Sequence, residues 1–181
     1  MKRIILVLSL FVVFSSCEKE TTTPANPTTG TPNTPVTPTP PVAEAATNFT
    51  LTSDTEAKVN LSDYKGKVVV LFFFGNGCTS CKATSPSIQS TFGTTYDSKK
   101  FQIIGLDTWD GNLASVQAFK KSSNLTFPLL LNASSVAKTF STTYDRLVVI
   151  DKEGFIRFKG NQLAGNDLNG AKKVVDDYVN K

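Results

Sequence analysis

The apolar run VVVLFFF, from Val68 to Phe74, constrains the fold of this chain more than any other feature. Polar residues do not alternate with apolar ones in it, so a strand built from it has no face for solvent and must be covered on both sides. A second run of this kind, FQIIGLDT, begins at Phe101, and a helical spacing of apolar residues follows in NLASVQAFKKSS. We therefore expect an α/β fold, in which helices flank both faces of a central mixed sheet.

The segments around these runs complete the predicted fold. Two short strand-like pieces in NFTLTSDTEAKVNLSDYKGK form an N-terminal β extension, and FPLLLN gives a short extended piece. RLVVIDKEGFIRFKG predicts a hairpin with Lys152, Glu153 and Gly154 at its tip. CTSCKATSPSIQSTFGTTY predicts a helix kinked by Pro86, and SSVAKTFS a short helix. AGNDLNGAKKVVDDYVNK predicts a closing amphipathic helix.

The N-terminal segment, MKRIILVLSLFVVFSSC, is typical of a secretory signal. Lys2 and Arg3 precede an apolar core, Ile4 to Phe14, which is shorter than the roughly 20 residues that span a bilayer. The small residues that follow end in Cys17, and this ending resembles the lipobox of bacterial lipoproteins, whose cysteine becomes the diacylated first residue. The resemblance implies a lipoprotein signal peptide at 1–16 and lipidation of Cys17. The alternative is an ordinary secreted protein with an unpaired thiol.

Residues 17–47 are rich in Thr, Pro, Asn and Gly and carry too little apolar surface to fold. We expect them to form a disordered tether, a semi-rigid spacer that favours the polyproline II conformation. The composition becomes globular at Asn48, so we expect one domain at 48–181. Together with a lipidated Cys17, this organisation indicates a lipid-anchored protein of the bacterial cell envelope, facing the periplasm or the cell surface.

The chain contains no histidine, and this narrows the chemistry that it can perform. Ser-His-Asp and Cys-His catalysis are excluded, as are zinc, iron and copper sites with histidine ligands. The net charge of +4 comes with scattered lysines, without the clustered basic stripe that nucleic-acid binding needs. Any chemistry must therefore use cysteine, carboxylate, hydroxyl or backbone groups, and we expect no nucleic-acid partner.

Cys78 and Cys81 lie between the first buried strand and the helix predicted to follow it. A thiol at a helix N-terminus is stabilised as the thiolate by unpaired backbone N–H groups and by the helix dipole. Cys78 would then be the attacking thiolate, and Cys81, one turn further in, the thiol that resolves a mixed disulfide. Lipidation of Cys17 leaves these two as an even pair, in a compartment where disulfides persist.

The segment FFFGNGCTSCKATSPSI resembles the active-site segment of thioredoxin-fold proteins, above all that of the membrane-tethered TlpA/ResA-like thiol-disulfide oxidoreductases of the redoxin, or AhpC/TSA, type. VNLSDYKGKVVVLFFF, FPLLL and VVIDKEGFIRFKG resemble other parts of that family, so the resemblance spans Asn48 to Lys181. It implies a thioredoxin-like fold and exchange with protein thiols and disulfides, with electrons passed to or from a membrane donor or acceptor. We expect a monomer that needs no cofactor and no metal. The matching positions are Phe73 and Phe74, Gly75, Asn76 and Gly77, Cys78 and Cys81, Lys82 and Pro86.

The proline that this family usually carries opposite the cysteines is missing. It stands, in cis, six residues before the aspartate of the closing hairpin, which is Asp151 here, and that position holds Asp145. A carboxylate there would raise the pKa of the Cys78 thiol, whereas the neighbouring Arg146 would lower it. The sequence leaves open which of the two side chains faces the sulfur.

Two acids that often handle the proton of the second cysteine are missing as well. Many members of the family have a glutamate where this chain has Thr84, and thioredoxin has a buried aspartate where it has Phe72. No acid is therefore visible to manage the proton of Cys81. Exchange does not require one, but we expect it to be slower at neutral pH.

We predict disulfide exchange by Cys78 and Cys81, and two other functions stay open. The pair could be an inert structural disulfide in a binding or assembly module, or two thiolates that hold a soft ion such as Cu(I). Trp109 could rim a substrate groove, although packing is the simpler interpretation, and Asp107 and Asp110 suit turns and helix caps. The predicted neighbours of the cysteines are Asn76, Gly77, Thr79, Ser80, Lys82, Asp145 and Arg146.

Overall fold

The computed structural model describes residues 44–181. The expected signal peptide, the lipidation site at Cys17 and nearly all of the expected tether lie outside these residues. Within the described part, no helix is both long enough and apolar enough to cross a membrane.

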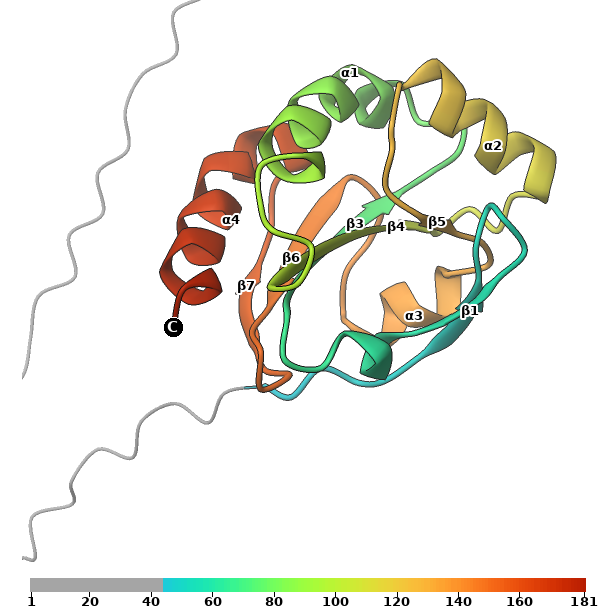
Figure 1. Cartoon of the computed structure of the whole chain (residues 1–181). Helices are drawn as coiled ribbons and strands as arrows, with labels where there is room; N and C mark the ends of the chain where they lie inside the picture. The colour runs from blue at the N-terminus through green and yellow to red at the C-terminus, as the bar shows by residue number, and fades with distance from the viewer. Residues whose placement is uncertain (1–43) are drawn as a thin grey trace, which may run out of the picture. The chain divides into compact units, whose positions relative to one another are not determined.

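A five-stranded mixed sheet forms the centre of the domain, in the order β5-β4-β3-β6-β7 (Figure 1). The middle strand is β3 (Val68–Phe74), and every one of its residues is buried, as its continuous apolar sequence predicts. On one side it pairs in parallel with β4 (Phe101–Asp107), which pairs in parallel with β5 (Leu129–Leu130). On the other side it pairs antiparallel with β6 (Arg146–Ile150), which in turn pairs antiparallel with β7 (Ile156–Lys159). The predicted central mixed sheet is confirmed.

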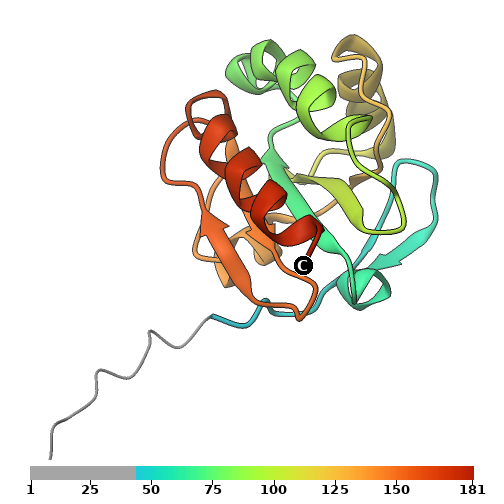
Figure 2. The same cartoon turned by 60° about the vertical axis from the view of Figure 1, so that its left-hand side comes forward.

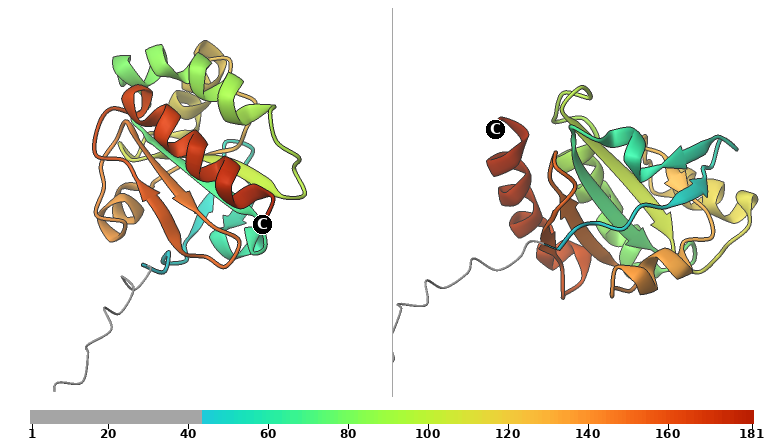
Figure 3. Two further views of the ribbon diagram at one scale, coloured as in Figure 1. Left: turned by 90° about the vertical axis from the view of Figure 1, so that its left-hand side faces the viewer. Right: turned by 90° about the horizontal axis from the view of Figure 1, so that it is seen from below.

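Each face of the sheet has its own apolar core. Alternate residues of β3 point to opposite faces, because side chains in a strand alternate. One set packs with residues of α1 (Thr79–Ile88), α2 (Leu113–Ser122) and α4 (Ala164–Val179). The other set packs with residues of α3 (Ser134–Thr139) and of the N-terminal extension. Figure 3 shows α4 and α3 on opposite faces of the sheet.

The N-terminal β extension is an antiparallel hairpin of β1 (Thr50–Thr52) and β2 (Lys58–Asn60), followed by the short 3-10 helix η1 (Leu61–Tyr64). Its turn is fixed to the sheet by the buried Asp54. One carboxylate oxygen of Asp54 accepts the N–H of Leu129 in β5 at 2.9 Å, and the other pairs with Lys120 of α2 at 2.8 Å.

The chain also pairs with the domain ahead of Asn48, where we expected the domain to begin. Ala45 forms an antiparallel bridge with Phe155, and the N–H of Ala46 donates to the carbonyl of Gly154 at 2.9 Å. The N-terminal segment therefore meets the tip of the β6–β7 hairpin.

Helix α1 contains Pro86 but continues past it to Ile88, and the π-helical turn η2 (Gln89–Gly93) follows directly. A proline inside a helix leaves the carbonyl four residues earlier, here that of Lys82, without its N–H partner. Both residues lie on the exposed side of α1, where water can satisfy that carbonyl, so the helix persists. Its buried side packs against α4, and the two helices lie side by side (Figure 2).

Candidate functional site

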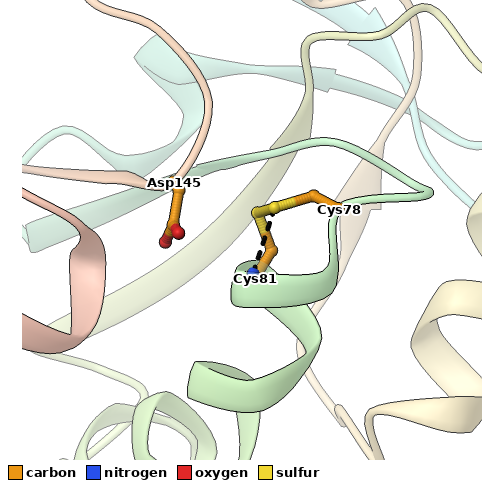
Figure 4. A group of neighbouring side chains, drawn as sticks. All are labelled: Cys78, Cys81 and Asp145. Carbon is orange, nitrogen blue, oxygen red and sulfur yellow. Dashed lines mark hydrogen bonds between the residues drawn. A yellow bond between two sulfur atoms is a disulfide. The ribbon is translucent and has the colours of Figure 1, made fainter.

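Cys78 is the N-cap residue of α1 and forms a disulfide with Cys81, with a Cα–Cα distance of 5.3 Å (Figure 4). The Cys78 sulfur accepts the backbone N–H of Cys81 at 3.1 Å. Cys81 is completely buried, whereas Cys78 is 4% exposed. The helix N-terminus is thus directed at Cys78, as predicted. In the dithiol form, such an N–H and the helix dipole favour a thiolate on this residue.

The loop that carries Cys78 is held by a carboxylate at the end of the neighbouring strand. Asp107, the last residue of β4, is completely buried. Its carboxylate accepts the backbone N–H of Asn76 at 3.1 Å and the side-chain amide of Asn76 at 3.0 Å. It also accepts the N–H of Gly111 at 2.7 Å. The predicted turn chemistry of Asp107 is confirmed, but the same side chain also fixes the loop before Cys78.

Trp109 lies across this loop. A Cβ on Gly75 would collide with the indole ring, and one on Gly77 would lie 3.2 Å from it. Both glycines therefore allow the ring to rest on the backbone beside Cys78. The packing interpretation of Trp109 holds for this contact, yet the side chain remains 47% exposed. Its ring meets that of Tyr144 edge to face, with centroids 5.3 Å apart.

Asp145 faces the disulfide. One sulfur atom from each cysteine and one carboxylate oxygen of Asp145 all lie within 4.8 Å of one another (Figure 4). Arg146 is directed elsewhere, since its Nη1 donates to the backbone carbonyl of Asp145 at 2.8 Å. This answers the question that the sequence left open. The sequence shows no acid to manage the proton of Cys81, but the structure brings the carboxylate of Asp145 close to that cysteine from a segment distant in sequence.

The backbone explains why a proline is absent at this position. Asp145 has a φ of +56°, in the left-handed region that aspartate tolerates better than most residues. Proline is fixed near −65° and does not fit that backbone. The side chain of Asp145 is buried, and its carboxylate accepts the N–H of Ala164, the first residue of α4, at 3.2 Å.

The other predicted neighbours of the disulfide differ in their contacts and their exposure. The hydroxyl of Ser80 is 3.3 Å from the Cys78 sulfur. Lys82 is exposed, and its backbone N–H donates to the carbonyl of Cys78 at 3.1 Å. Thr79 is the exposed first residue of α1. Thr84, at the position of the family's glutamate, lies against Gly165 of α4.

Three large hydrophobic side chains in residues 44–181 are exposed, and all three belong to segments around the disulfide. Trp109 covers the loop before Cys78, and Tyr144 immediately precedes Asp145. Leu163 immediately precedes Ala164, whose N–H donates to Asp145. We call Trp109, Tyr144 and Leu163 the apolar rim. No single sequence pattern predicts it, because its members come from three different loops.

A mixed sheet of this order, with a Cys-x-x-Cys disulfide where its central strand meets a helix, defines a thioredoxin-like protein. Residues 42–159 match the model of the AhpC/TSA family. The chain belongs to this family and is a thiol-disulfide oxidoreductase of its TlpA/ResA-like branch.

Individual relatives agree with this assignment. The thiol-disulfide oxidoreductase ResA of Bacillus anthracis is 30% identical over 142 residues, which cover 77% of this chain and 78% of the relative. The solution structure of a candidate protein disulfide isomerase from Bacteroides thetaiotaomicron is 30% identical, with a TM-score of 0.69 over 77% of this chain and 90% of that one. A thiol:disulfide interchange protein from Bacteroides sp. shares the fold at 24% identity, with a TM-score of 0.64 over 77% of this chain and 90% of that one.

Proposed function

We propose that this protein is a membrane-tethered oxidoreductase of the bacterial cell envelope, which reduces disulfides in partner proteins through Cys78 and Cys81. The observation that carries the proposal is the placement of the pair. One sulfur lies at the helix N-terminus and close to the surface, and the other is completely buried behind it. Such a pair can attack with the first thiol and resolve with the second.

The reaction proceeds in two exchanges. The Cys78 thiolate attacks one sulfur of the partner's disulfide, the S–S bond breaks, and the second partner sulfur leaves as a thiolate. Cys81 then loses its proton and attacks the Cys78 sulfur of the mixed disulfide. The partner's remaining sulfur leaves with the bonding electrons, so the partner gains two electrons and the pair becomes the Cys78–Cys81 disulfide. A membrane electron donor would restore the dithiol.

The apolar rim supports a protein partner. Exposed aromatic side chains are enriched where proteins bind one another, and here they border the reactive pair. A polypeptide that brings its disulfide to Cys78 must pass over this rim. A small-molecule disulfide would need no such surface.

The reduction potential of the Cys78–Cys81 disulfide distinguishes this function from that of an inert structural disulfide. We expect a reduction potential between roughly −120 and −270 mV, the range of exchange enzymes. The measurement equilibrates the purified protein with graded thiol buffers, alkylates the free thiols and counts them by mass spectrometry. A value below about −300 mV, typical of structural disulfides, would contradict the proposal and favour the binding module.

The signal and spacer sequences support the membrane tether. Replacing Cys17 with serine is expected to move the protein from the membrane fraction to the soluble envelope fraction, because the acyl chains attach to that sulfur. Cell fractionation and labelling with a fatty-acid analogue measure this. The matched control is Ser16→Ala, which keeps a small residue before the cysteine and should remain on the membrane. A wild-type protein that takes up no fatty-acid label would rule out the lipid anchor.

A further inference from the structure

The carboxylate of Asp145 is buried beside the disulfide with half of its hydrogen-bonding capacity unused. The side chain is completely buried. One oxygen, Oδ1, shares the N–H of Ala164 with the backbone carbonyl of Asp145, at 3.2 Å and 3.0 Å. The other, Oδ2, has no hydrogen-bond partner among the described residues. A buried polar atom without a partner costs about 1–3 kcal/mol, so its retention calls for a functional reason.

The disulfide itself explains why the partner is missing. Bonded sulfur atoms have no hydrogen to donate, so neither cysteine can satisfy the carboxylate in the oxidised state. Reduction creates a thiol on Cys81, which is completely buried and within 4.8 Å of an Asp145 carboxylate oxygen. The S–H of that thiol is a donor that the carboxylate can accept. The unsatisfied oxygen can therefore gain a hydrogen-bond donor when the disulfide is reduced.

We propose that Asp145 accepts the proton of the Cys81 thiol in the resolving step and returns it when the pair is reduced again. This role of Asp145 rests on the proposed function of the protein in disulfide exchange. As the S–H bond of Cys81 breaks, the proton passes to the carboxylate of Asp145. The electron pair left on sulfur forms the new bond to Cys78, and the partner's sulfur leaves with the electrons of the mixed disulfide. During reduction by the electron donor, the Cys81 thiolate that leaves takes the proton back.

No other charged group among residues 44–181 competes for this role. The first turn of α4 carries Asp167, α1 carries Lys82, and β6 carries Arg146. The other charged side chains of α4 form ion pairs along that helix, Lys172 with Asp176 and Lys173 with Asp177. Lys82 is exposed, and Arg146 donates to a backbone carbonyl. Asp167 accepts the N–H of Gln162 at 2.9 Å. None of them forms a hydrogen bond or an ion pair with the carboxylate of Asp145.

The test separates the two exchanges in a single turnover. The reduced protein is mixed with an excess of a protein disulfide, and the mixed disulfide is followed by acid quenching and mass spectrometry. The first step depends on the concentration of the partner, and the resolving step does not. In Asp145→Asn, which keeps the shape of the side chain, we expect the resolving step at neutral pH to slow at least about tenfold. The attack by Cys78 should be unchanged or faster, because a nearby negative charge is removed.

The pH profile distinguishes proton transfer from a structural effect. In Asp145→Asn, the resolving rate should rise about tenfold per pH unit through neutrality, because the attacking thiolate then forms only when the Cys81 thiol loses its proton without the carboxylate. In the wild-type protein it should be nearly independent of pH through neutrality. Asp167→Asn is the matched control, because it neutralises another buried carboxylate and should keep the wild-type profile.

Three outcomes would be decisive. Equal resolving rates and equal pH profiles in wild type and Asp145→Asn would overturn the role of Asp145 and leave the proposed function intact. A reduced wild-type protein that leaves the protein disulfide unreduced would overturn the proposed function itself. If Asp145→Asn does not fold, the wild-type profile alone decides, since a tenfold rise per pH unit in it would exclude an internal proton acceptor.

Discussion

Replacing Cys78 with serine is expected to abolish disulfide exchange, whereas replacing Cys81 with serine should trap the partner as a stable mixed disulfide. The difference follows from burial. The helix N-terminus is directed at the Cys78 sulfur, and Cys78 is 4% exposed. The Cys81 sulfur is completely buried and can reach only a mixed disulfide formed on Cys78. A serine hydroxyl at either position is not ionised near neutral pH and attacks disulfides negligibly.

The two variants are compared on non-reducing gels and by mass spectrometry, after incubation of the reduced proteins with a protein disulfide. Ser80→Ala is the matched control, because it removes only a hydroxyl 3.3 Å from the Cys78 sulfur and leaves both thiols. It should turn over without accumulating adduct. If Cys78→Ser trapped the partner protein, the roles of the two cysteines would be reversed. If Cys81→Ser trapped no partner, the assigned roles would be wrong.

Replacing Trp109 with alanine should lower kcat/KM for a protein disulfide by about 30-fold, or about 2 kcal/mol, the typical contribution of an aromatic anchor in an interface. Trp109 is the largest member of the apolar rim and borders Cys78 through the glycine loop. The rate with a small disulfide should change little, because such a substrate needs only the sulfur. Steady-state rates with both substrates measure the difference.

Tyr64→Ala is the matched control for this substitution. Tyr64 is an aromatic residue of η1, close to the start of β3, whereas the disulfide follows the end of that strand. Its removal should leave both rates unchanged. An equal loss with protein and small substrates in Trp109→Ala would assign the ring to loop packing and exclude a contact with the partner.

The sequence predicts those parts of the molecule that depend on local patterns. The continuous apolar run of β3 requires two covered faces, and the structure has them. The position of Cys78 between a buried strand and a helix indicates a sulfur at a helix N-terminus, which is where it lies. Both inferences need only neighbouring residues, so they do not depend on the rest of the fold.

The parts that the sequence does not predict depend on contacts between distant segments. Asp107 holds Asn76 because β3 and β4 pair in a register that places Phe74 beside Asp107. Asp145 faces the sulfurs because its backbone adopts a positive φ, which a spacing of residues does not reveal. The available signal in the sequence is an aspartate at the position of the family's proline, but the direction of its side chain requires the structure.

The described N-terminal segment joins the domain at the tip of the β6–β7 hairpin, through Ala45 and Ala46. Ile150, near that tip, pairs with Val69 at the start of β3, whereas Arg146 pairs with Phe73 at its end, beside the disulfide. The two places are four residues apart along β3, about 13 Å. The described N-terminal segment therefore joins the domain at the end of the sheet opposite the disulfide. In the proposed tethered protein, the spacer would leave the surface around Cys78 open to a partner protein.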